Sequence, residues 1–132
     1  MMFEEWVRVQ DRNPPASASE VEAFVSRLNA NLPSDYLTFL REANGAEGSV
    51  GPKARYLVLW PVGDIMRINA DYHVNEFAPH LLLFGSNGGG EAYAFKLTAN
   101  PVTVVSVPFI GMDEEVEWGN SFGEFLRRLA QS

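Results

Sequence analysis

The sequence contains no cysteine, which excludes disulfide bonds and thiolate chemistry and fits a reducing compartment. It also lacks any apolar run approaching the ~20 residues that a membrane-spanning helix needs. The first thirteen residues include five charged ones and no apolar stretch of the kind found in secretory signals. We therefore expect a cytoplasmic protein.

Basic residues are scarce: ten lysines and arginines stand against seventeen acidic residues, for a formal net charge of -7. The basic pairs Lys53/Arg55 and Arg127/Arg128 do not form a stripe, so the counterion release that drives nucleic-acid binding has no source here. An acidic surface attracts a basic partner and speeds its encounter. The simpler alternative is that the acidity only keeps the protein soluble.

The phosphate-binding motif GxxxxGK[ST] does not occur, and the spacing GxSxG occurs only at residues 119–123, where Ser121 has the position of a helix cap. The glycine-rich stretch at residues 85–90 leads into a strand pattern, and Glu91 behind it would repel a phosphate. A metal site could be drawn from His73, Glu76 and His80, but Pro79 interrupts the helix that would align them. We predict no cofactor and no metal.

Residues 81–97 are the best-defined pattern in the chain. The apolar run at residues 81–84 predicts a strand covered on both faces, and the glycine-rich turn leads to a second strand. In that second strand Tyr93, Phe95 and Leu97 alternate with smaller residues and share one face. The pattern predicts a β-hairpin at the centre of the protein.

Three helices have clear start signals. Ser19 and Glu22 predict a capping box for a helix that runs to about Asn29, and Ser121 and Glu124 predict another for the last helix. Between them, a helix opens at the Leu32-Pro33-Ser34-Asp35 sequence and ends at Asn44-Gly45. Each carries apolar residues at helical spacing, so each is expected to cover a sheet.

The remaining segments are assigned by composition. We expect a helical turn or two packed loosely at the edge over residues 1–9, a mobile loop at 46–53, and a short helix or turn at 63–72. Residues 75–80 should be irregular, residues 56–60 and 102–107 should form strands, and residues 112–117 should form a loop or edge strand. The predicted fold is α+β: a mostly antiparallel sheet of four to six strands with helices packed mainly on one face. The length of 132 residues allows one domain.

Three motifs in order carry a resemblance to a known family. They are the Leu32-Pro33-x-x-Tyr36 helix ending in Asn44-Gly45, the Gly-Ser-Asn-Gly-Gly-Gly-Glu-x-Tyr-x-Phe hairpin of residues 85–95, and the terminal Ser-Phe-x-x-Phe-Leu helix at residues 121–126. Together they resemble the SUKH superfamily, the Smi/Knr-type domain. The resemblance starts at about Ser19, so residues 1–18 are interpreted as an N-terminal extension of a single domain, residues 1–132.

The resemblance implies a domain without catalytic activity. Many bacterial members resemble immunity proteins that bind and neutralise toxins, often nucleases, whereas eukaryotic members are regulatory scaffolds. We therefore expect a protein partner, a basic toxin domain, and neither nucleic acid nor membrane. The residues expected to bind this partner are Asn87, Glu91, Tyr93, Asp113, Glu114, Glu115, Glu117 and Trp118. Asn87 stands where the family often has Asp, which removes one charge from the hairpin.

Two other functions stay open. A pocket between sheet and helices would favour a small-molecule or peptide-binding regulatory domain. A histidine within hydrogen-bonding reach of a hydroxyl, or a metal beside it, would favour a hydrolase. The acidic residues at 113–117 form a solvated face in the simplest interpretation, and a partner surface in the functional one. Trp118 is either a binding hot spot or packing at the edge of the core.

Overall fold

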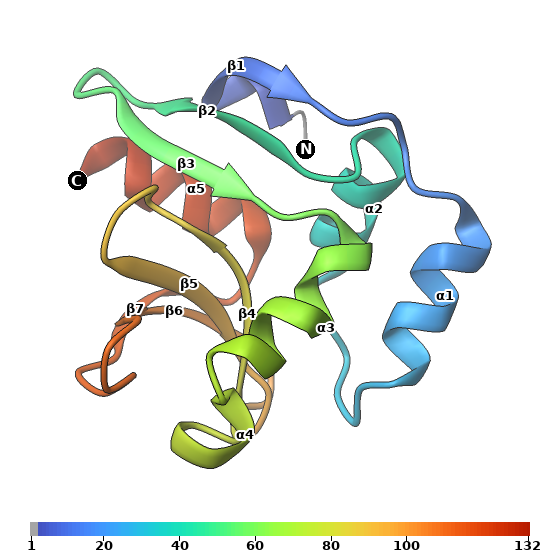
Figure 1. The fold of residues 1–132 in the computed structure, drawn as a ribbon. Coiled ribbons are helices and arrows are strands. Elements are labelled where there is room, and N and C mark those ends of the chain that lie inside the picture. The colour runs from blue at the N-terminus through green and yellow to red at the C-terminus, as the bar shows by residue number, and fades with distance from the viewer. Residues whose placement is uncertain (1–2) are drawn as a thin grey trace.

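The computed structural model describes residues 3–132, and it has an antiparallel sheet of seven strands (Figure 1). Each strand pairs with the next along the chain, so the sheet is a simple meander. The strands are β1 (Val7–Arg12), β2 (Ala46–Val50), β3 (Arg55–Leu59), β4 (Leu81–Ser86), β5 (Glu91–Lys96), β6 (Thr103–Pro108) and β7 (Val116–Gly119). The predicted α+β class is confirmed, but the predicted four to six strands were too few.

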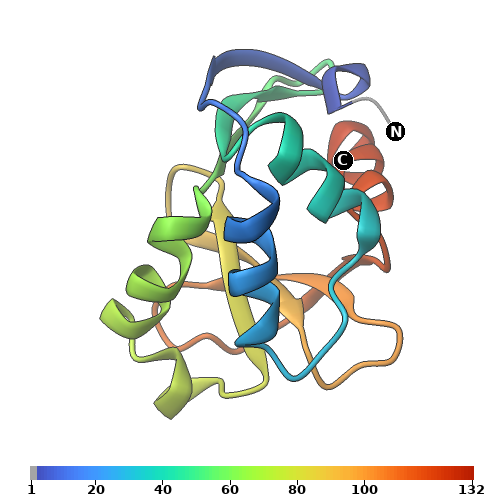
Figure 2. The same ribbon diagram turned by 90° about the vertical axis from the view of Figure 1, so that its right-hand side faces the viewer.

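Most helices pack on one face of the sheet (Figures 1 and 2). The helical elements are η1 (Phe3–Glu5), α1 (Ala18–Ser26), α2 (Ser34–Glu42), α3 (Val62–Asp71), α4 (Val74–Phe77) and α5 (Phe122–Gln131). Helices α1, α2 and α5 bury their apolar stripes in one large core with β4 and β5, whereas α4 covers a smaller core on the opposite face. Residues 75–80, predicted to be irregular, therefore include most of a short helix. None of the helices in residues 3–132 is long and apolar enough to span a membrane.

Strand β5 divides the two cores by its alternation. Tyr93 and Phe95 lie in the large core, and Ala92 and Ala94 lie in the small one, as the sequence predicts. In the large core Phe95 stacks on Phe84 with ring centroids 4.1 Å apart. The aromatic side chains of β4, β5, α2 and α5 thus meet in one cluster, and this cluster fixes the helices on the sheet.

Helix α1 begins two residues earlier than predicted. Its N-cap is Ser17, whose side chain accepts a hydrogen bond from the Glu20 backbone at 3.1 Å, and the Glu20 carboxylate accepts one from the Ser17 backbone at 3.0 Å. The sequence offers two overlapping Ser-x-x-Glu patterns, and Ser19 with Glu22 was the wrong one. Ala16 decides between them because it is buried and its N–H donates to the Leu40 carbonyl, which holds the chain against α2 just before the cap.

Residues 46–50 form β2, not the mobile loop predicted from their glycines. Gly48 lies where the backbone of β1 approaches most closely, because a Cβ there would collide with the carbonyl oxygen of Arg8. Gly48 is therefore a close-packing position inside a strand. Val50, fully buried, pairs with Val7 of β1 and anchors this end of the strand.

The N-terminal segment packs more tightly than predicted. Residues 1–2 of the predicted helical turn lie outside the described part of the chain. Phe3 begins a short 3-10 turn and is buried against Phe39 with ring centroids 4.7 Å apart. From Val7 onwards the chain is β1, so the helical prediction was wrong there. The helical spacing of Phe3, Trp6 and Val7 reflects a turn followed by a strand that bury residues on the same core.

Helix α5 lies within the curve of the sheet (Figure 1). Its C-terminal end meets the β2–β3 turn, because a Cβ at Gly51 would collide with Ala130. Its N-terminal end follows β7 and is capped by Ser121 and by the Asp35 carboxylate, which accepts hydrogen bonds from the Phe122 and Gly123 backbones at 3.0 and 2.9 Å. The carboxylate of Glu124 pairs with Arg128 at 3.4 Å, so the predicted capping box is only half formed.

Candidate functional site

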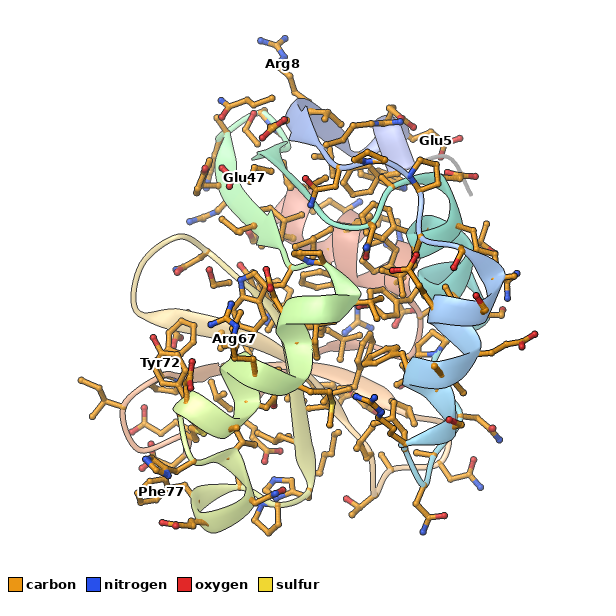
Figure 3. All side chains as sticks on the ribbon, turned by 45° about the vertical axis from the view of Figure 1, so that its right-hand side comes forward. Glu5, Arg8, Glu47, Arg67, Tyr72 and Phe77 are labelled. Atoms are coloured by element: carbon orange, nitrogen blue, oxygen red, sulfur yellow. The ribbon has the colours of Figure 1, made fainter. Side chains whose placement is uncertain are left out.

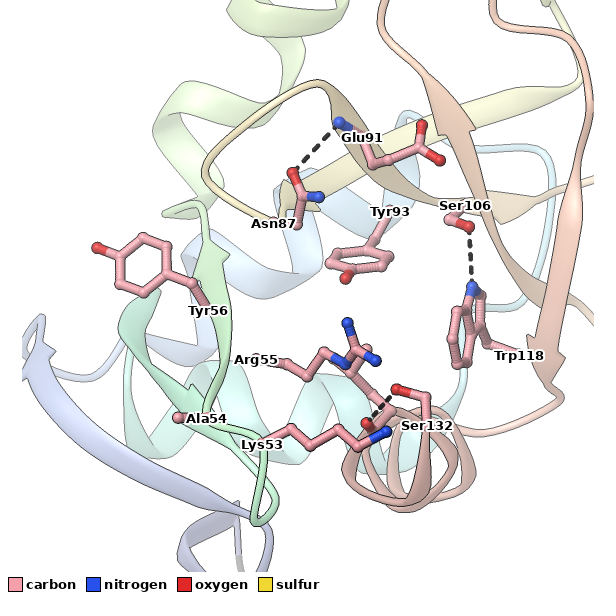
Figure 4. A pocket seen from close by; sticks show the side chains of 11 residues that line it. Lys53, Ala54, Arg55, Tyr56, Asn87, Glu91, Tyr93, Ser106, Trp118 and Ser132 are labelled. Carbon is pink, nitrogen blue, oxygen red and sulfur yellow. Dashed lines mark hydrogen bonds between the residues drawn. The ribbon is translucent and has the colours of Figure 1, made fainter.

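A hollow of about 450 Å³ opens where the sheet separates into two halves (Figure 4). Strand β3 pairs with β4 through two residue pairs, Val58 with Ser86 and Leu59 with Gly85. Beyond Ser86 the chain turns into the β4–β5 hairpin, and the start of β3 diverges from it. The lining residues come from five parts of the chain and are Lys53, Ala54, Arg55, Tyr56, Asn87, Glu91, Tyr93, Ser106, Trp118, Leu129 and Ser132.

Asn87 shapes the hairpin turn at the rim of the hollow. Its side-chain oxygen accepts hydrogen bonds from the Gly89 and Glu91 backbones at 2.8 and 3.2 Å. Gly88 has a positive φ of 78° and packs on the ring of Tyr56, which a Cβ would strike. The turn is thus supported by the protein's own β3. Because its oxygen is occupied, Asn87 presents its amide nitrogen to the hollow (Figure 4).

Tyr93 forms the floor of the hollow. Only 4% of its surface is exposed, and its ring packs on Phe125 with centroids 4.8 Å apart. Burial raises the pKa of Tyr93 to about 12; the Glu91 charge adds to the rise and the Arg55 charge opposes it. The hydroxyl is therefore protonated at neutral pH and able to donate a hydrogen bond.

Trp118 forms a side wall. Its indole N–H donates to the Ser106 hydroxyl at 2.9 Å, which fixes the plane of the ring. The side chain is partly buried against the large core and partly open to the hollow. Trp118 therefore packs at the edge of the core and is also accessible from the hollow. Its role as a binding hot spot stays a prediction.

Two basic residues that were not among the predicted binding residues form the wall of the hollow opposite Trp118. Lys53 lies in the β2–β3 turn and Arg55 at the start of β3, and Figure 4 shows both side chains extending into the hollow. Neither takes part in an ion pair within residues 3–132. Their closeness in the sequence was the only sign of a basic cluster, and two basic residues are too few to predict a site.

The eight predicted residues fall into two groups. Asn87, Glu91, Tyr93 and Trp118 line the hollow. Asp113, Glu114, Glu115 and Glu117 belong to the β6–β7 connection and β7, on the other side of the sheet. The division follows from strand alternation: Glu117 pairs with Val105, which lies in the small core, whereas Trp118 packs on the large one. The sequence therefore contains two candidate surfaces where we expected one.

The second surface combines two segments, residues 71–80 and 109–117, which we call the acidic strip. They run alongside each other, since Phe109 contacts Tyr72 with ring centroids 4.7 Å apart and Glu115 contacts His80. Between these two points Met112 is buried in the small core beside α4. The strip contains six carboxylates and no lysine or arginine. Four large apolar side chains stand exposed on it, Tyr72, Phe77, Ile110 and Val116, the first two labelled in Figure 3.

Glu115 anchors the strip. Its carboxylate meets His80 Nε2 at 2.5 Å and Lys96 Nζ at 2.9 Å. The hydrogen bond from His80 lowers the pKa of Glu115, Lys96 lowers it further, and burial partly opposes both. Asp71 is also paired, with Arg67 at 3.3 Å. The side chains of Asp113, Glu114 and Glu117 are exposed and have no ion pair within the described residues, so they are the ones available to a partner.

The histidines do not form the metal site that the sequence allowed. His73 Nδ1 lies 4.0 Å from Glu76 Oε1, whereas His80 faces Glu115. Over residues 3–132 no group of three or more His, Asp or Glu side chains is placed to hold a metal ion. None of the hydrogen bonds in this part of the chain joins either histidine to a hydroxyl, so the arrangement that would favour a hydrolase is not formed.

The chain is thus an α+β domain: an antiparallel meander around a C-terminal helix, with a lined hollow on one face and an acidic strip on the other. The family assignment comes from the sequence. Residues 15–128 match the model of the SMI1 / KNR4 family (SUKH-1), and the chain belongs to this family. The SUKH resemblance predicted from three motifs is thereby confirmed. No curated protein matches the chain.

Proposed function

We propose that this protein is a non-enzymatic immunity protein that binds a basic toxin domain in the bacterial cytoplasm and neutralises it. Membership of the SUKH-1 family supports the proposal through the resemblance of many bacterial members to immunity proteins. The observation that carries it is the acidic strip, which combines unpaired carboxylates with exposed apolar side chains. Such a surface offers both steering and a buried contact to a basic protein.

The two parts of the strip have different roles in the proposed complex. Asp113, Glu114 and Glu117 attract the partner's lysines and arginines and speed the encounter. Phe77 and Ile110 are 64% and 92% exposed, so their burial in a complex is favourable by about 25 cal/mol per Å² of apolar surface before the costs of association are subtracted. A nuclease toxin fits this surface well, because its own nucleic-acid-binding face has to be basic.

The test begins with capture of the partner. Tagged protein is incubated with lysate of its own cells at low and at high salt, and the retained proteins are identified by mass spectrometry. We expect one basic protein that is retained at low salt and weakened at high salt. Neutralisation is then measured by growth: cells express the captured basic protein either alone or together with the immunity protein. No growth rescue would contradict the proposed function even if binding occurs.

The interface is tested with charge reversals that have a matched control. The variant Asp113→Lys/Glu114→Lys reverses two of the three unpaired charges of the strip, and Glu22→Lys/Glu42→Lys changes the net charge equally on α1 and α2. We expect the strip variant to associate about tenfold more slowly at low salt and the control to stay within about twofold of the wild type. Equal slowing in both would show that only net charge matters, and no slowing would exclude the strip.

A further inference from the structure

The hollow carries chemistry opposite to that of the acidic strip. Four of its side chains present hydrogen-bond donors: the Lys53 ammonium, the Arg55 guanidinium, the Tyr93 hydroxyl and the Asn87 amide nitrogen. Apart from the Glu91 carboxylate, the side-chain acceptors nearby are occupied. The Asn87 oxygen accepts from the Gly89 and Glu91 backbones, and the Ser106 hydroxyl accepts from Trp118. A ligand for this hollow therefore has to supply acceptors.

The Tyr93 hydroxyl is a donor that the hollow offers to a ligand. The side chain is more than nine-tenths buried, yet within the described residues its hydroxyl takes part in no hydrogen bond. The group is different from the hydroxyl of Tyr36, which is sealed in the core, because Tyr93 lines the hollow. Because the hydroxyl opens onto the hollow, water can satisfy it, and a ligand that supplies an acceptor can take the place of that water.

The lysine and the arginine of the hollow favour a ligand with a negative charge. Lys53 and Arg55 contribute +2 and Glu91 contributes -1, so the lining side chains sum to +1 in a protein whose net charge is -7. One carboxylate balances this charge. A doubly charged phosphate would leave an excess next to Glu91, and the donors come from side chains instead of the backbone cradle typical of phosphate sites.

The apolar wall of the hollow indicates which chemical group is attached to the carboxylate. Trp118 is held in a fixed plane by Ser106, and Leu129 of α5 also lines the hollow. A flat ring beside charged donors suits a methylene chain that ends in a carboxylate. We propose that the hollow binds an acidic side chain, with the glutamate or aspartate carboxylate between Lys53, Arg55 and Tyr93 and its methylene groups on Trp118. The volume of about 450 Å³ exceeds one side chain, so the flanking backbone of a peptide segment enters as well.

The test uses defined peptides and needs no toxin, so its outcome is independent of the proposed function. The isotope-labelled protein is titrated with the blocked peptide acetyl-Ala-Glu-Ala-amide, its Gln analogue, glutarate and inorganic phosphate. Binding is followed by NMR through the Trp118 indole and the Asn87 side-chain amide. The variant Trp118→Phe assigns the indole signal. We expect saturation by the Glu peptide with a dissociation constant on the order of 1 mM and at least tenfold weaker binding of the Gln analogue.

Variants locate the site. Arg55→Ala and Tyr93→Phe should each weaken binding of the Glu peptide about tenfold, while Arg41→Ala on α2 leaves it unchanged. If Arg55→Ala loses the dispersed spectrum of a folded protein, Lys53→Ala replaces it. Stronger binding of glutarate than of the peptide would assign the hollow to a free carboxylic acid. Equal shifts with the Glu and Gln peptides, stronger binding of phosphate, or no saturation in any titration would overturn the proposal.

Discussion

Asn69 offers the sharpest test of how this fold is held together. It lies on α3 and is buried. Strand β3 pairs with β4 only at Ser86 and Gly85, and at Leu83 the Asn69 side chain makes the hydrogen bonds that a neighbouring strand would otherwise make. The side-chain oxygen accepts from the Leu83 N–H at 2.9 Å, and the side-chain nitrogen donates to the Leu83 carbonyl at 2.9 Å and to the Ile65 carbonyl at 2.8 Å. Leu83 is fully buried, so no water can replace these bonds.

The substitution Asn69→Leu keeps the approximate volume and removes both bonds to Leu83. Two buried backbone groups then lack partners, at about 1–3 kcal/mol each, so we expect the free energy of unfolding to fall by about 2–5 kcal/mol. The Ile65 carbonyl adds little because it is also within reach of the helical backbone ladder. Urea unfolding followed by circular dichroism measures the change.

The matched control is Asn75→Leu, at an exposed position of α4. We expect a change within about 0.5 kcal/mol there. If Asn69→Leu costs less than about 1 kcal/mol, or no more than the control, then the side chain does not act as a substitute strand and the reasoning is refuted.

Three further predictions concern the core, a helix cap and the acidic strip. Tyr36→Phe removes a buried hydroxyl that has no partner within the described residues, so the unfolding free energy should stay level or rise by about 1–2 kcal/mol; a clear loss would reveal a hidden partner. Asp35→Ala removes two charge-assisted bonds to the start of α5 and should cost about 2–4 kcal/mol in urea unfolding, against less than about 1 for Asp64→Ala, at a partly exposed first-turn residue that pairs with the exposed Arg67. Glu115 has a pKa lowered from 4.5, so its ion pairs stabilise the fold above that pH and are lost as the pH falls through the lower folded value. The stability difference between wild type and Glu115→Gln should therefore shrink below about pH 4.5, and a difference that persists at pH 2 would contradict the assignment.

Much of the fold follows from patterns within single segments. The hairpin at residues 81–97, the face shared by Tyr93 and Phe95, and the helices α2 and α5 are set by alternation, helical spacing and start signals. These signals are local because each depends on residues a few positions apart. The three motifs that carry the family resemblance lie in the same segments, which is why the family was also predictable.

The errors lie where a distant segment decides the local structure. Gly48 indicates a loop by composition, but the backbone of β1 makes it a strand position. Ser17 replaces Ser19 as the cap because Ala16 is tied to α2. Asn69 gives no local sign of its role, since its partner Leu83 is fourteen residues away on another element.

The sequence by itself determined an acidic, cysteine-free α+β domain of the SUKH-1 family with a central hairpin, because composition and short-range periodicity are properties of the chain alone. The tertiary structure alone decided how the charges are distributed. It placed Asp113, Glu114 and Glu117 beside exposed Phe77 and Ile110 on one side of the sheet, and it brought Lys53 and Arg55 together with Tyr93 and Trp118 on the other. Adjacent strand residues point to opposite faces, and the curvature of the sheet joins elements far apart in sequence.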